Sequence, residues 1–232
     1  MKYYVIADLH GRYDLLDAAL TKIRAVASGE YKIVTLGDYV DRGKKSRQII
    51  QRLMEEQEKH PDIFVCLKGN HEDMMCAFLG MPGNYGESFL FNGGAATLDS
   101  YGVGERELPE ACSHIPDPHL EFVKRLATSY LRPPYLFVHA GVVPALELEE
   151  QRVEDMLWIR QEFIFSPHRL GATVVFGHTP MRAVMVDLPY KLGIDTGLVY
   201  GGKLTCIELT EGVLYQVGRN SRQAKTSAIA LS

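Results

Sequence analysis

The sequence predicts an α/β fold in which a parallel sheet covered by helices packs face to face on a second, antiparallel or mixed sheet. Within residues 1–80, short apolar runs alternate with helical patterns, which is typical of βαβ units in a parallel sheet. From Thr173 onward, short apolar runs are separated by turn residues without a helical pattern between them. We find no internal repeat or linker, so we expect one domain over residues 1–218 and a frayed polar tail over residues 219–232.

The individual elements follow from residue spacing. A first helix is indicated by apolar residues at helix spacing, which are Leu15, Leu16, Ala19, Leu20, Ile23 and Val26. A second helix fits residues 46–58, whose apolar face holds Ile49, Ile50, Leu53 and Met54. Residues 80–111 are rich in Gly, Asn, Pro and Tyr, so we expect a lid or flank over the site. The strands expected in the second sheet span residues 183–187, 191–194, 203–209 and 213–217.

The composition is that of a soluble globular protein, with 46% hydrophobic and 23% charged residues among 232. The formal net charge of −4 argues against a nucleic-acid-binding surface, so an anionic substrate must be attracted locally. The four cysteines form no CxxC pair, which favours buried thiols in a reducing cytoplasm. The N-terminus has no secretory signal pattern, and no apolar run approaches the ~20 residues of a membrane span. We therefore expect a cytoplasmic protein without a membrane partner.

Polar residues follow the apolar runs at five places along the chain. These residues are Asp8 and His10, then Asp38, Asp41 and Arg42, then Asn70 and His71, then His139, and last His178. In an α/β protein, ligands bind in the crevice beyond the carboxyl ends of the strands. The residues are therefore expected to meet at one edge and to build a metal site. The segment Asp195-Thr196-Gly197 is expected either to be a turn or to line that site.

Oxygen and nitrogen ligands without a thiolate suit Mn²⁺, Fe or Zn²⁺. A set of this kind can hold two ions ~3.5–4 Å apart, which is the spacing of two-metal phosphoryl chemistry. Asp38 lies nearest its strand end, where its carboxylate can bridge two cations. Each motif taken alone could instead be a helix cap or a hydrogen-bonded core histidine. Because all five motifs lie at matching strand ends, caps and core histidines do not explain the five motifs together.

The motifs carry a family resemblance. Asp-x-His-Gly, Gly-Asp-x-Val-Asp-Arg-Gly, Gly-Asn-His-Glu, His-Ala-Gly and Gly-His-Thr-Pro occur in this order. The chain thereby resembles the calcineurin-like metallophosphoesterases, and more narrowly the phosphoprotein phosphatase family in its bacterial and bacteriophage lambda type. The resemblance runs from Asp8 to about Gly202. It implies a four-layer α/β/β/α sandwich that holds a dinuclear metal site.

The resemblance also implies a role for each residue. The first metal ion would be held by Asp8 and His10, the bridging ligand would be Asp38, and the second ion would be completed by Asn70, His139 and His178. Mn²⁺ is the first choice for both ions, with Fe and Zn²⁺ as alternatives. His71 would be the general acid that protonates the leaving oxygen, and Asp41 would orient it. Arg42 and Arg160 would bind the phosphate oxygens.

The expected reaction is in-line attack on phosphorus by a metal-bridging hydroxide, without a covalent phosphoenzyme. The first hypothesis is hydrolysis of phosphoserine and phosphothreonine in proteins, with phosphotyrosine as a further substrate. The second is symmetrical hydrolysis of diadenosine tetraphosphate. Members of that branch usually carry Gly-Asn-His-Asp where this chain has Gly69-Asn70-His71-Glu72, which favours the first hypothesis.

Two further hypotheses are weaker. A catalytically inactive phosphate-binding or scaffold protein predicts at least one lost ligand, and the sequence has all of them. A nuclease or cyclic phosphodiesterase would be expected to show a more basic surface. The chain lacks the long C-terminal extensions of eukaryotic relatives, so we expect no obligatory regulatory subunit. The expected partner is a phosphorylated protein or a small phosphorylated molecule.

Overall fold

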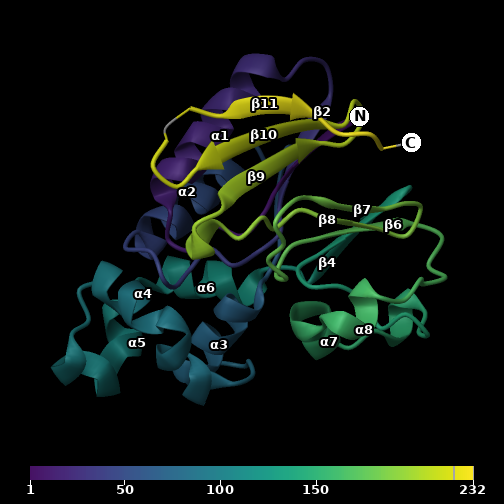
Figure 1. Ribbon diagram of the computed structural model, residues 1–232. Helices are drawn as coiled ribbons and strands as arrows, with labels where there is room; N and C mark the ends of the chain where they lie inside the picture. The colour runs from purple at the N-terminus through teal and green to yellow at the C-terminus, as the bar shows by residue number, and fades with distance from the viewer. Residues whose placement is uncertain (222, 232) are drawn as a thin grey trace.

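The computed structural model describes residues 1–221 and 223–231, and its architecture is mixed α/β with two packed sheets (Figure 1). The predicted fold class is confirmed. The first sheet has the strand order β11-β10-β9-β1-β2-β3 and the second β4-β5-β6-β8-β7. The strands are β1 (Lys2–Ile6), β2 (Tyr31–Thr35), β3 (Phe64–Cys66), β4 (Ser129–Arg132), β5 (Tyr135–Val138), β6 (Thr173–Phe176), β7 (Met185–Asp187), β8 (Lys191–Gly193), β9 (Lys203–Glu208), β10 (Val213–Gly218) and β11 (Lys225–Ala228).

The first part of the chain forms the two βαβ units that the sequence predicts. Strands β1, β2 and β3 are parallel, and helices α1 (Tyr13–Val26) and α2 (Ser46–Lys59) connect them. In Figure 1 both helices lie on the face of this sheet that points away from β6–β8. Because the strands are parallel, their carboxyl ends lie at one edge of the sheet. The loops that follow β1, β2 and β3 therefore start side by side.

Strands β9 and β10 were expected in the second sheet, and that expectation is wrong. Strand β9 pairs antiparallel with β1, with Val5 opposite Ile207, and β10 pairs with β9. Cys206 packs in the helix-side core of the first sheet, and Ile207 packs between the sheets. The strand is thus buried on both faces, as a strand inside a large sheet requires. Spacing along the chain identified the strands but carried no information about their partners.

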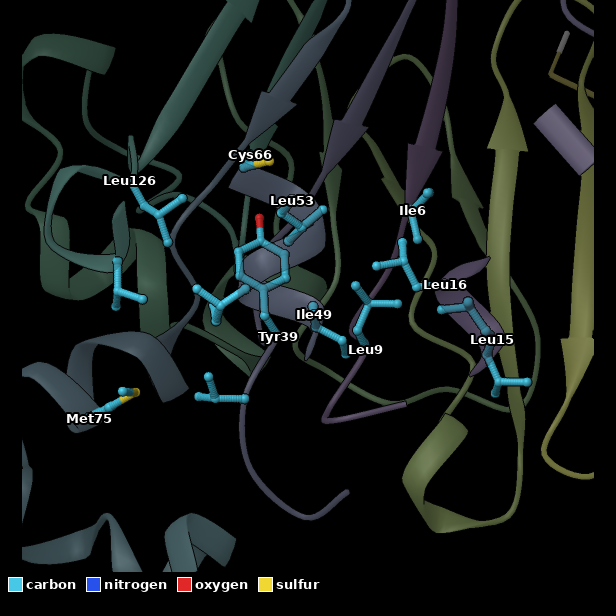
Figure 2. Packing of buried hydrophobic residues seen from close by; sticks show 14 of the residues in the cluster. Ile6, Leu9, Leu15, Leu16, Tyr39, Ile49, Leu53, Cys66, Met75 and Leu126 are labelled. Carbon is cyan, nitrogen blue, oxygen red and sulfur yellow. The ribbon is translucent and has the colours of Figure 1, made fainter. Parts of the chain in front are cut away.

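Three apolar cores fix the layers. Tyr4 and Ile6 of β1 face α1 and α2 in the first core, part of which Figure 2 shows around Tyr39 and Leu53. Tyr3 and Val5, the alternate residues of β1, face the second sheet in the middle core. The third core lies on the other face of the second sheet. Full burial of one leucine side chain stabilises such a core by about 1.5–3 kcal/mol.

The remaining helices are short. They are α3 (Asn70–Phe78), α4 (Ala95–Ser100), α5 (Ala111–His114), α6 (Asp117–Arg125), α7 (Val153–Trp158) and α8 (Gln161–Ile164), with single turns η1 (Gly86–Ser88), η2 (Leu90–Gly94), η3 (Glu105–Glu110), η4 (Leu148–Glu150) and η5 (Leu198–Tyr200). Residues 80–111, which we expected to form a lid or flank, contain η1, η2, α4 and η3. Glycines at φ +104° (Gly93) and φ +79° (Gly102) break their helical continuity.

The tail differs from the fraying that we expected over residues 219–232. Residues Lys225–Ala228 form β11 and pair antiparallel with β10, with Gln216 opposite Lys225. The outer edge of β10 offers backbone donors and acceptors, so a polar segment can add a strand there without an apolar face. Residues 222 and 232 lie outside the described residues. No helix in the described part of the chain is long and apolar enough to cross a bilayer.

Candidate active site

The predicted site residues converge where the loops after β1, β2, β3, β5 and β6 meet. A cavity of about 60 Å³ is lined by all of them except Asp41 and His139, and its predicted members are Asp8, His10, Asp38, Arg42, Asn70, His71, Arg160 and His178. Asp41 and His139 are fully buried and contact residues of the cavity wall. The structure therefore brings together every residue that the sequence motifs selected.

The backbone is strained where these residues lie. Non-glycine residues with φ in the left-handed region are, among the described residues, Tyr85 and five predicted site residues, which are His10, Asp38, Asp41, Arg42 and His178. Such a conformation costs of order 1–3 kcal/mol for each residue and persists only where the surroundings enforce it. Here the N–H groups of Leu9 and His10 donate to the Asp38 carbonyl at 3.0 and 2.8 Å, which locks the first two loops together.

Asp38 lies at the centre of two clusters of ligand atoms. His10, Asp38 and His71 offer atoms within 4.8 Å of one another, and so do Asp38, His139 and His178. The Asp38 carboxylate has Oδ2 3.5 Å from His10 Nε2 and Oδ1 3.3 Å from His139 Nε2. One carboxylate thus faces both clusters, which is the position of a bridging ligand.

Two histidines of the clusters, His10 and His139, present a lone pair to the site. Nδ1 of His139 donates to the Leu36 carbonyl at 2.8 Å, and Nδ1 of His10 donates to the Val40 carbonyl at 3.0 Å. Burial lowers the pKa of His139 to about 3 and lowers the pKa of His10 well below its ordinary value, so both rings are neutral. With the proton on Nδ1, each Nε2 is an acceptor that points into the site.

Acceptor atoms therefore face one another in the second cluster. His139 Nε2 lies 2.9 Å from Asn70 Oδ1, and His178 Nδ1 lies 3.0 Å from the same oxygen. A neutral His139 has no proton to place between its Nε2 and this oxygen, so the two atoms repel. A divalent cation bound by both atoms would remove that repulsion, and imidazole, amide and carboxylate donors suit Mn²⁺, Fe and Zn²⁺. The donor set fits the metal chemistry expected from the sequence.

Asp8 has a different surrounding from the other expected ligands. Its carboxylate accepts from the backbone N–H of His178 at 3.1 and 3.2 Å, and it belongs to neither cluster of three. Burial and the nearby Asp195 carboxylate raise the pKa of Asp8 well above its ordinary value. Burial, Asp8 and Glu72 do the same to the pKa of Asp38. Buried carboxylates this close together need a positive charge to stay ionised.

His71 and Asp41 form a hydrogen-bonded pair beside the clusters. His71 Nδ1 lies 2.5 Å from Asp41 Oδ2, and Nε2 of the same ring lies 3.1 Å from Arg42 Nη2. Burial raises the pKa of Asp41 to about 8 and, with Arg42, lowers the pKa of His71 to about 3. The pair as a whole thus keeps one dissociable proton near neutral pH.

Two arginines border the cavity. Arg42 Nη1 donates to His10 Nε2 at 2.8 Å, and the backbone N–H of Arg42 donates to the Gly93 carbonyl at 3.1 Å. Arg160 Nη1 donates to the His178 carbonyl at 3.2 Å. Guanidinium groups of this kind bind the oxygens of phosphate in pairs. The cavity thus combines metal-type donors, a proton-bearing pair and two fixed cations.

A comparison with protein families shows to which family a chain with these site residues belongs. The family model for calcineurin-like phosphoesterases matches residues 1–206. The chain belongs to the calcineurin-like phosphoesterase family. Members of this family use divalent metal ions, in agreement with the donor clusters. The protein is therefore a phosphoesterase.

Relatives of this phosphoesterase are named for different substrates. It is 29% identical over 210 residues to a serine/threonine-protein phosphatase 1 of Salmonella typhimurium, covering 87% of this chain and 89% of that protein. It is 24% identical to a symmetrical bis(5'-nucleosyl)-tetraphosphatase of a Janthinobacterium species, over 94% of this chain and 96% of that protein. The fold matches the crystal structure of a putative diadenosine tetraphosphatase with TM-score 0.67 and 20% identity, over 94% of this chain and 93% of that one.

The structure adds residues that the motifs did not assign to the site. Both Glu72 carboxylate oxygens accept backbone N–H bonds, from Asp38 and Gly69 at 2.8 and 2.9 Å and from Tyr39 and Val40 at 2.8 and 3.1 Å. The side chain thus fixes the loop after β2 against the start of α3. In the sequence, Glu72 is recognisable only as the last residue of the Gly-Asn-His-Glu motif. Trp158 and Asp195 also line the cavity, and Trp158 packs partly buried against the first core.

Thr97 of α4 supports the His71–Asp41 pair. Its hydroxyl donates to Asp41 Oδ1 at 2.7 Å, accepts from the Asp41 N–H at 2.7 Å, and lies 3.0 Å from the Ser46 hydroxyl. Thr97 is fully buried in the phosphoesterase. Residues 80–111, expected to be a lid or flank over the site, therefore contain a residue that positions Asp41. No motif signals this role, because Thr97 is far from Asp41 in the sequence.

We expect Thr97→Val to lower the turnover number of the phosphoesterase about tenfold, because Asp41 loses a buried hydrogen bond worth about 1–3 kcal/mol. Thr97→Ser keeps the hydroxyl and is expected to stay within about twofold of the native enzyme. Initial rates for both variants at several pH values provide the measurement. A Thr97→Val variant as active as the native enzyme would show that the hydroxyl does not support Asp41.

Proposed function

We propose that the protein is a metal-dependent phosphomonoesterase that acts on phosphoserine and phosphothreonine in proteins, with phosphotyrosine as a further substrate. The observation that carries the proposal is the His71–Asp41 pair beside two clusters of lone-pair donors. A proton donor at that place suits an alkoxide leaving group, which must be protonated as it departs. The relative named as a serine/threonine phosphatase, 29% identical over 87% of this chain, supports the protein substrate.

We assign the metal ligands from the sequence motifs whose residues line the cavity or contact its wall. Asp8 and His10 are proposed for the first ion, Asp38 for both, and Asn70, His139 and His178 for the second. Mn²⁺ is our first choice, with Fe and Zn²⁺ as alternatives. Two bound divalent ions supply activation of water as the nucleophile and neutralisation of charge on the phosphoryl group.

The protein's own groups supply the rest of the chemistry. Arg42 and Arg160 border the cavity from opposite loops and would hold the phosphate oxygens, which places the phosphorus for in-line attack. Asp41 holds the His71 ring through Nδ1, so that Nε2 faces the cavity and can pass a proton to the leaving oxygen. No covalent phosphoenzyme is needed. We also propose that the enzyme works without an obligatory regulatory subunit, in the cytoplasm.

Symmetrical hydrolysis of diadenosine tetraphosphate is the second candidate. The symmetrical tetraphosphatase relative covers 94% of this chain, and the same site chemistry would serve a phosphoanhydride. The Glu72 contacts weigh against it. An aspartate at this position, which that branch usually carries, has one methylene less and would not span the four backbone N–H groups in the present loop geometry.

The test is an initial-rate panel on metal-free enzyme reloaded with Mn²⁺. Phosphoserine, phosphothreonine and phosphotyrosine peptides are compared with diadenosine tetraphosphate, and His71→Asn serves as the control. We expect kcat/KM for the phosphoserine and phosphothreonine peptides to exceed that for the dinucleotide at least tenfold, with most of the rate lost in the variant. Faster cleavage of the dinucleotide would overturn the protein-substrate proposal and keep the mechanism.

A further inference from the structure

A second, larger cavity adjoins the active site. Its volume is about 430 Å³, and His10, Arg42 and Val199 line both cavities. The rest of its wall includes Arg12, Asp14, Lys44, Lys45 and Arg219. We call this cavity the basic groove. Because Arg42 forms part of both walls, the groove begins where the proposed phosphate site ends.

The charge of the groove is opposite to that of the chain. Asp14 is the single carboxylate among the described residues of its wall, and it accepts from Arg12 Nε and Nη2 at 3.0 and 2.8 Å. The charges of that ion pair cancel, which leaves Lys44, Lys45 and Arg219 beside Arg42 as cations without a carboxylate partner in the described part of the chain. The formal net charge of the whole protein is −4. A local excess of positive charge on an acidic protein attracts an anion to this place.

Contacts between the loops after β1 and β2, which contain site residues, fix the shape of the basic groove. A Cβ on Gly11 would lie 2.3 Å from the Gly43 carbonyl oxygen, so only glycine allows the two loops to meet. The Lys45 N–H donates to the Gly11 carbonyl at 3.1 Å, and Arg12 donates to the Arg219 carbonyl. The Lys45 ammonium also lies 6.0 Å from the centre of the Tyr13 ring. These contacts fix the backbone that presents the cations.

We propose that the basic groove binds a second phosphate group of the same substrate, so that the enzyme prefers substrates with two phosphates close together. The inference rests on the proposed function and adds a preference to it. The first phosphate lies on Arg42 and Arg160, and the second lies on Lys44, Lys45 and Arg219 across the shared wall. Lysine ammonium groups are suited to bind phosphate as point charges. The second phosphate comes either from a neighbouring phosphorylated residue or from a polyphosphate chain.

The test compares a peptide with one phosphoserine and the same peptide with two adjacent phosphoserines. The groove variant is Lys44→Gln/Arg219→Gln, which leaves the proposed catalytic residues unchanged. The matched control is Lys124→Gln/Arg125→Gln, which removes the same charge from the exposed face of α6. Dissociation constants for the peptides are measured by calorimetry in the His71→Asn background, so that the peptides bind without being hydrolysed. Diadenosine tetraphosphate is titrated as the polyphosphate source.

We expect the second phosphoserine to tighten binding about tenfold, and the groove variant to remove most of that gain while the control keeps it. Binding of the peptide with one phosphate is expected to change less than about twofold in either variant. Added salt should reduce the gain, because the cations are exposed. Equal affinity for both peptides, with a dinucleotide affinity that the groove variant leaves unchanged, would overturn the inference.

The two sources of the second phosphate give separate outcomes. A gain for the doubly phosphorylated peptide that depends on the groove supports a phosphoprotein with clustered sites. A loss of affinity in the groove variant for the dinucleotide alone supports the groove with a polyphosphate occupant. Combined with fast dinucleotide cleavage by the enzyme, that second outcome would overturn the proposed function and keep this inference.

Discussion

The His71→Asn variant is expected to lose about 10²–10⁴-fold in kcat on phosphoserine peptides, because the leaving alkoxide would have no proton donor. The loss on p-nitrophenyl phosphate is expected to be much smaller, since nitrophenolate leaves without protonation. The physical basis is the pair formed by His71 Nδ1 and Asp41 Oδ2 at 2.5 Å, which keeps a proton near neutral pH. Initial rates with both substrates at saturating Mn²⁺ provide the measurement.

The same variant separates two roles for His71. Its Nε2 lies 3.9 Å from Asp38 Oδ2, so geometry alone would also allow this ring to be a metal ligand. A proton donor predicts an unchanged affinity for Mn²⁺ in His71→Asn, measured by calorimetry on the metal-free protein. A drop in Mn²⁺ affinity, with equal rate losses on both esters, would contradict the role as general acid.

We expect Asp38→Asn to weaken Mn²⁺ binding at least about 100-fold, because the two clusters would lose their shared anionic ligand. The side-chain shape is nearly kept, and asparagine tolerates the φ of +53° that Asp38 adopts. Turnover should fall with metal affinity. Calorimetry with Mn²⁺ measures the affinity directly, and the exposed Asp99→Asn on α4 removes the same charge away from the site.

The stability of Asp38→Asn should change in opposite directions with and without metal. Without metal, burial and the nearby carboxylates of Asp8 and Glu72 disfavour the charged form of Asp38, so its replacement by a neutral amide is expected to raise the melting temperature by about 2–4 °C. With saturating Mn²⁺ the native protein gains stability from the ion, whereas the variant gains far less. A variant that melts lower than the native protein under both conditions would show that the carboxylate serves mainly to hold the loop.

Residue spacing and strand-end motifs were enough to predict two packed sheets and the convergence of the site, whereas the four-layer order was implied by the family resemblance. The runs before Asp8, Asp38 and Asn70 are apolar and short, so their carboxyl ends were expected at one edge, where the structure has them. The strand partners of β9 could not be predicted, because both faces of β9 are apolar and either sheet would accept it. Alternation along a strand reports burial and does not report which neighbour supplies it.

The supporting residues were harder to predict than the site residues. Thr97 contacts Asp41 across 56 positions of sequence, and a single buried threonine in a glycine-rich segment carries no periodic signal. Glu72 is part of the Gly-Asn-His-Glu motif, but the motif does not reveal its contacts. Its four backbone N–H donors belong to two loops that only the fold brings together. Trp158 packs partly buried against the first core, and its place in the cavity wall depends on how α7 ends.

The two halves of the donor set come from different sheets. Asp38 and Asn70 follow β2 and β3 of the first sheet, whereas His139 and His178 follow β5 and β6 of the second. An ion held by all four would act as a crosslink between the sheets, at the edge of the apolar layer that separates them. Opening of that layer would then require release of the ion. Amide hydrogen exchange in β5 and β6 should therefore slow as metal concentration rises, even though those strands contain no ligand themselves.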